Sequence, residues 1–188
     1  MFVLLAGAAA PQAISPDWQN RNWELGVFAA GATGEENTNS FSEAQILSGG
    51  FFVARALTDK IGQGWWSGRV EFGADFLPLF VQLAPQRIHG IGFDPVILRW
   101  NSSVGRGRMA PFLELGGGGV HTNKKLPAGD SSNFNFMVHG GGGVRIAVRR
   151  DQAFEIGCRW WHISNANLGN RNPEFNGIQL SLGWHWLR

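Results

Sequence analysis

The stretch from Arg159 to Gln179, RWWHISNANLGNRNPEFNGIQ, contains residue types that can hydrolyse an ester. His162 and Ser164 are two positions apart, so in a strand they would lie on one face, about 6.6 Å apart along the chain. An imidazole at that spacing can reach the hydroxyl, with His162 as general base and Ser164 as the nucleophile of an acyl transfer. Asn165 could donate an amide hydrogen, from its side chain or its backbone, to the developing oxyanion.

The spacing alone leaves a second interpretation open. Polar residues often end a strand beside a turn, and the loop after Ser164 is rich in Asn and Gly, as turn chemistry selects. A catalytic histidine would also need a carboxylate to orient it. The choice between a hydrolytic site and a plain strand end depends on the elements that hold these residues.

Those elements are predicted to be β-strands. Apolar and polar residues alternate with period two in eight segments, and no long stretch has a helical period. The segments span 22–33, 43–58, 64–82, 88–102, 108–122, 133–149, 153–165 and 176–187. The pattern predicts an all-β, eight-stranded, antiparallel up-and-down barrel that forms a single domain over residues 14–188, with a bend at Asp94–Pro95.

The direction of the oily faces separates a membrane barrel from a soluble barrel that binds an apolar ligand inside. The segments are long enough to cross a bilayer at a tilt, and Trp residues near their ends fit the membrane interfaces. The polar faces mix charges of both signs with glycine, a set that the narrow lumen of eight strands can hold. These features favour a transmembrane barrel, in which His162 and Ser164 continue the lipid-facing side of Ile156 and Trp160. Polar residues facing lipid are candidates for function.

Composition and charge narrow the possible partners. The formal net charge is +2 and there is no long Lys/Arg run, so nucleic-acid binding is not expected. One cysteine and five scattered histidines lack metal-ligand spacing, so no metal or cofactor is predicted.

Residues 1–13 resemble the latter part of a secretory signal. An even strand number puts both termini on the periplasmic side and the longer loops, including 166–175, outside.

The pattern HISNAN…NP…NGI closely resembles the signature of the PagL family, the lipid A 3-O-deacylases of Gram-negative outer membranes. This resemblance implies an integral outer-membrane protein whose site lies on the outer wall, where it meets the outer leaflet. It implies His162 as base, Ser164 as nucleophile and Asn165 in the oxyanion hole of a serine esterase. The implied reaction hydrolyses the ester of a 3-hydroxyacyl chain of lipid A, and lipopolysaccharide and outer-membrane lipids are the implied partners.

One position departs from the family pattern. The family's glutamate follows the G-I pair, whereas this chain has Gln179 after Gly177–Ile178. Glutamine can hydrogen-bond an imidazole but supplies no charge, and its parity directs it to the lumen. Glu174, in the preceding loop, is the candidate substitute acid. The alternative to an active esterase is therefore a catalytically weak or inactive barrel with a structural, lipid-binding or partner-binding role.

Overall fold

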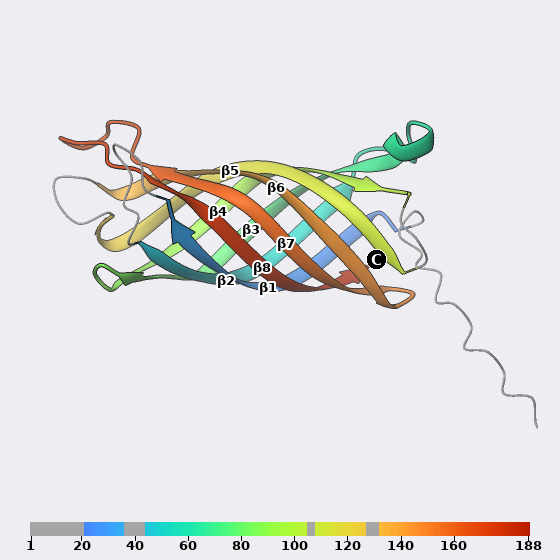
Figure 1. Cartoon of the computed structure of the whole chain (residues 1–188), viewed down its shortest axis with the longest axis horizontal. Coiled ribbons are helices and arrows are strands. Elements are labelled where there is room, and N and C mark those ends of the chain that lie inside the picture. The colour runs from blue at the N-terminus through green and yellow to red at the C-terminus, as the bar shows by residue number, and fades with distance from the viewer. Residues whose placement is uncertain (1–20, 36–43, 105–107, 127–131) are drawn as a thin grey trace, which may run out of the picture.

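The chain forms one closed barrel in which consecutive strands pair and β1 closes on β8 (Figure 1). The computed structural model describes residues 21–35, 44–104, 108–126 and 132–188. The strands are β1 (Trp23–Gly34), β2 (Gln45–Ala56), β3 (Gly68–Ala84), β4 (Ile88–Ser102), β5 (Met109–Leu126), β6 (Ser132–Arg149), β7 (Gln152–Ser164) and β8 (Phe175–Leu187). A short 3-10 helix, η1 (Gly64–Trp66), precedes β3.

All eight strand pairs are antiparallel, which confirms the predicted up-and-down barrel. Most strand ends fall within a few residues of the prediction. The clearest difference is η1, which occupies the predicted start of the third strand. The predicted signal segment, 1–13, lies outside the described residues. Within the described ranges, no helix is long and apolar enough to cross a membrane.

The apolar side chains of the alternating pattern face outward, as a membrane barrel requires. Phe72 is 41% exposed and Leu182 is 54% exposed, although both are large and apolar. Glu71 and Gly73, on either side of Phe72, are buried. Leaving this much apolar surface exposed is unfavourable in water but favourable against lipid chains, so the direction of the oily faces is confirmed.

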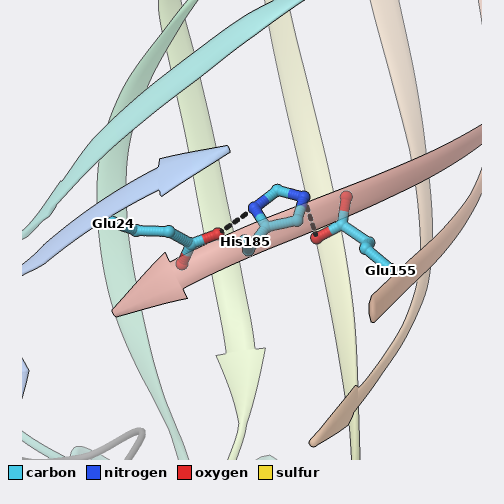
Figure 2. A group of neighbouring side chains, drawn as sticks. All are labelled: Glu24, Glu155 and His185. Atoms are coloured by element: carbon cyan, nitrogen blue, oxygen red, sulfur yellow. Dashed lines mark hydrogen bonds and ion pairs between the residues drawn. The ribbon is translucent and has the colours of Figure 1, made fainter. Parts of the chain in front are cut away.

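The half of the lumen nearest the C-terminus is filled by charged side chains. Glu24 of β1 and Glu155 of β7 lie on either side of His185 of β8, as Figure 2 shows. Arg145 contacts both carboxylates, at 2.8 Å from Glu24 and 3.1 Å from Glu155. Arg99 lies 2.9 Å from Glu155 and 2.6 Å from Glu114. Buried charges are tolerated only when they are paired in this way.

The other half of the lumen is built around an apolar cluster, which was not predicted from the sequence. The buried side chains of this cluster come from all eight strands and from Ala44 just before β2: Ala32, Ala44, Ile46, Leu77, Phe80, Ile88, Val120, Leu126, Met137, Trp161, Ile163 and Phe175. Trp161 contacts Phe80 and Phe175 edge to face, with ring centroids 6.0 Å apart in each pair. The ends of β7 and β8 are therefore held from inside by aromatic packing.

Two irregularities help to fill this small lumen. The pairing of β4 with β5 shifts register between Phe93 and Val96, which confirms the bend predicted at Asp94–Pro95. A second shift lies between Leu77 and Phe80 of β3, so that both of these residues turn inward into the apolar cluster. Bulges of this kind re-aim side chains without ending a strand.

The buried ion pairs lead to a stability prediction. We expect Arg145→Ala to lower the free energy of unfolding by about 3–5 kcal/mol, because Glu24 and Glu155 lose a buried cation. The matched control is Arg188→Ala, whose partner Asp151 lies 3.7 Å away and whose side chain is 62% exposed. The control should change stability by no more than about 0.5 kcal/mol. Guanidinium unfolding in detergent micelles measures both, and equal losses would contradict the assignment.

Candidate active site

The candidate residues lie where β7 ends at the barrel rim opposite the C-terminus (Figure 1). Trp161 and Ile163 point inward into the apolar cluster. Because side chains alternate along a strand, His162 and Ser164 point outward. On β8 the same alternation turns Phe175 inward and Asn176 outward. Packing inside the barrel thus fixes the side chains that face the membrane.

His162 contacts a polar side chain on each of its ring nitrogens. Nε2 lies 2.9 Å from Ser164 Oγ, and Nδ1 lies 2.7 Å from Asn176 Oδ1. The register of β7 and β8 places His162 directly opposite Asn176, and side chains so placed touch across a sheet. The three side chains lie in hydrogen-bond contact in the order that a nucleophile, a base and an orienting group would need.

Glu174 is the next member of this chain of contacts. Its Oε2 accepts a hydrogen bond of 3.3 Å from Asn176 Nδ2. The predicted substitute acid therefore lies at the site, where it contacts the amide of Asn176, the residue that in turn contacts the imidazole of His162.

Asn165 organises the loop that follows Ser164. It is fully buried, and its side-chain amide donates 2.8 Å to the Arg171 carbonyl while its Oδ1 accepts 2.9 Å from the Asn167 backbone. Its backbone N–H donates to Asn172 Oδ1 at 2.9 Å. Ala166 and Asn167 have positive φ, of 50° and 64°. Left-handed backbone at non-glycine residues is strained and is held here by the Asn165 bonds.

Gln179 does not lie at this site. Its side chain is fully buried in the lumen, where its oxygen accepts from Arg159 and its Nε2 donates 3.1 Å to Ser48 Oγ. Gln179 was a candidate partner for the imidazole, but it lies in the lumen, as its parity in the sequence indicated, and not on the wall that carries His162.

Asn176 is the site residue that the sequence prediction missed. It shares the outward parity of Ile178 and Leu180, the exposed residues that follow it on β8. The sequence did contain a signal for Asn176. It is a polar residue with lipid-facing parity, at the end of its strand that lies nearest to His162 and Ser164. What the sequence could not supply is the register that sets it opposite His162.

The surroundings of His162 on the membrane side are apolar. The Trp160 ring stacks on the imidazole, with centroids 5.8 Å apart and planes inclined by 19°. Phe136 and Val138 of β6 pair with Ser164 and His162, and these two apolar side chains are 42% and 50% exposed. The polar group therefore stands at the edge of an apolar wall.

A separate group, inside the barrel, has the residue types of a metal site. Ligand atoms of Glu24, Glu155 and His185 all lie within 4.8 Å of one another (Figure 2). The same carboxylate oxygens already contact Arg145, at 2.8 Å and 3.1 Å. A cation there would meet a guanidinium in direct contact with its ligands, so we interpret the group as an ion-pair network.

The chain matches the family described as lipid A 3-O-deacylase (PagL) over residues 12–185. It belongs to the PagL family. The barrel is accordingly one of the bacterial outer membrane. No curated protein sequence matches the chain closely enough to report.

Solved structures show the same fold. The crystal structure of the outer membrane enzyme PagL is 16% identical, with a TM-score of 0.56, and the match covers 84% of this chain and 97% of that one. Neisserial surface protein A is also 16% identical, with a TM-score of 0.59 and coverage of 87% and 96%. OprG from Pseudomonas aeruginosa is 10% identical, with a TM-score of 0.59 and coverage of 89% and 96%. At these identities the likeness concerns the barrel alone.

The bonds of Asn165 predict a local effect on the loop. We expect Asn165→Ala to speed tryptic cleavage after the exposed Arg171 by about tenfold or more, because two side-chain hydrogen bonds of about 1 kcal/mol each are lost. Asn170→Ala, at an exposed position of the same loop, is the matched control and should leave the cleavage rate unchanged. An unchanged rate in Asn165→Ala would show that the loop does not depend on these bonds.

Proposed function

We propose that this PagL-family barrel is a lipid A deacylase that hydrolyses an ester-linked 3-hydroxyacyl chain at the outer-leaflet side of its wall. The observation that carries the proposal is the run of contacts from Ser164 through His162 to Asn176, on the lipid-facing side at the outer rim. Family membership supplies the reaction class, and the outward direction of the side chains fits a substrate that stays in the membrane.

The reaction begins with attack of Ser164 Oγ on the ester carbonyl carbon. The hydroxyl proton passes to His162 Nε2, 2.9 Å away, and a tetrahedral intermediate forms with its negative charge on the former carbonyl oxygen. His162 then protonates the departing sugar oxygen, the ester bond breaks, and an acyl-serine remains. Water then attacks this acyl group and gives a proton to His162, which passes it to Ser164 Oγ as the bond from the acyl carbon to Oγ breaks; the fatty acid is released and Ser164 and His162 are restored.

The proposed role of Asn165 in this sequence is twofold. Its bonds to Arg171 and Asn167 hold the loop against the end of β7. Its backbone N–H is bonded to Asn172, whereas Arg171 uses one of the two hydrogens of the side-chain amide, so the side-chain amide is the proposed oxyanion donor. A preorganised donor of this type stabilises the charge of the intermediate.

A second candidate function has one observation in its favour. The group that contacts His162 Nδ1 is an amide, and an amide carries no charge to stabilise the imidazolium that forms. A barrel with little or no hydrolytic activity, serving a structural, lipid-binding or partner-binding role, would be compatible with that residue. The intact Ser164–His162 contact favours the hydrolase, since a non-catalytic wall has no need of a polar pair facing lipid.

Mass spectrometry of lipid A separates the two functions. Cells that express the protein should yield lipid A lacking one 3-hydroxyacyl chain, and cells that express Ser164→Ala should yield lipid A with all its chains, because the nucleophile is gone. Cys158→Ala, on the same outward face of β7, is the matched control and should deacylate as the unmodified protein does. Intact lipid A in every strain, with the barrel present in the membrane, would exclude the hydrolase.

A further inference from the structure

An amide next to a catalytic histidine has two orientations, and only one of them supports catalysis. With its oxygen toward the imidazole, the amide accepts from Nδ1–H and leaves Nε2 as the base. With its nitrogen toward the imidazole, it donates to Nδ1, and the ring proton moves to Nε2, where it cannot accept from serine. In serine proteases, exchanging the orienting carboxylate for an amide lowers kcat by about 10⁴-fold through this wrong tautomer.

Glu174 resolves the ambiguity at Asn176. An ionised carboxylate only accepts hydrogen bonds, so the amide atom 3.3 Å from Glu174 Oε2 must be the nitrogen of Asn176. The amide oxygen then points to His162 Nδ1, at 2.7 Å, and must accept from it. His162 Nε2 is left without a proton and can accept from the Ser164 hydroxyl, at 2.9 Å.

The backbone keeps Glu174 in place for this task. Phe175, between Glu174 and Asn176, is 4% exposed and packs on Trp161 in the apolar cluster. Because side chains alternate along a strand, Glu174 and Asn176 on either side of Phe175 point to the outer face of the barrel wall. Asn176 is also held through its carbonyl, which accepts 2.6 Å from the Glu35 backbone N–H of the adjoining β1 end.

We propose that Glu174 is a positioning residue, which fixes the amide of Asn176 so that His162 carries its proton on Nδ1 and accepts from Ser164 on Nε2. The inference rests on the proposed function. It assigns the role of the missing catalytic carboxylate to two residues in series, an amide that contacts the imidazole and a carboxylate that orients the amide.

The test is a double-mutant cycle, with deacylation of purified lipid A in detergent as the measured rate. Glu174→Ala should lower kcat by about tenfold or more, the worth of one charge-assisted hydrogen bond, and leave KM unchanged. Glu174→Gln should retain most of the rate, because its amide oxygen can still accept from Asn176. Glu35→Ala, which removes another carboxylate at this rim but keeps the backbone bond to Asn176, is the matched control and should not change kcat.

The decisive arm uses Asn176→Asp. A carboxylate has two equivalent oxygens and needs no orientation, so adding Glu174→Ala to Asn176→Asp should cause no further loss. An equal loss from Glu174→Ala in both backgrounds would overturn the proposal, as would a change in KM alone.

A second measurement does not depend on turnover. Nitrogen-15 NMR of the His162 imidazole should show the proton on Nδ1 in the unmodified protein and a mixture of both tautomers in Glu174→Ala. The same tautomer in both would overturn the positioning role. If lipid A stays intact with the unmodified protein while the tautomer responds to Glu174, the proposed function fails and the positioning role stands.

Discussion

The structure of the site depends on the packing of Trp161, Phe80 and Phe175 inside the outer end of the barrel. The pairing of β7 with β8 has no register shift, so inward anchors at Trp161 and Phe175 require their neighbours His162 and Asn176 to face outward. The register of β7 and β8 then sets these two opposite each other. The polar side chains on the lipid-facing wall are thus positioned by apolar packing on the inner face of the same strands. Because the site stands on strands, its geometry is held more rigidly than loops would hold it.

The lumen beneath the site divides into two layers with different physical roles. The apolar cluster near the outer rim supports the strand ends that carry the site. The charged layer nearer the C-terminus, with Arg99 and Arg145 among Glu24, Glu114 and Glu155, fills the remaining interior without a continuous apolar core. The exterior can then be almost wholly apolar, as lipid requires, while the interior still satisfies its charges.

Much of this architecture follows from the period of the sequence, because side-chain parity does not depend on distant contacts. Parity predicts the barrel, the outward His162 and Ser164, and the inward Gln179. It does not predict which outward residues meet across strands, because that register depends on loop length and bulges, and so Asn176 was not predicted. The apolar layer was not predicted either. Trp161 and Ile163 share the inward parity of the charged Glu155 and Arg159, so parity alone suggests a polar interior. The bulge in β3 brings Leu77 and Phe80 inward to pack with them, and this bulge is visible only in the structure.

The chemistry proposed for this member of the PagL family differs from a serine–histidine–carboxylate triad in one link. An amide stands next to the imidazole, and a carboxylate stands behind the amide. The most direct test of the central claim, that Ser164 is a nucleophile activated by His162 on the membrane face, is peptide mass spectrometry after treatment with a long-chain alkyl fluorophosphonate. The account predicts a covalent adduct on Ser164 that is lost in His162→Ala. An unlabelled Ser164, or labelling that persists without His162, would contradict it.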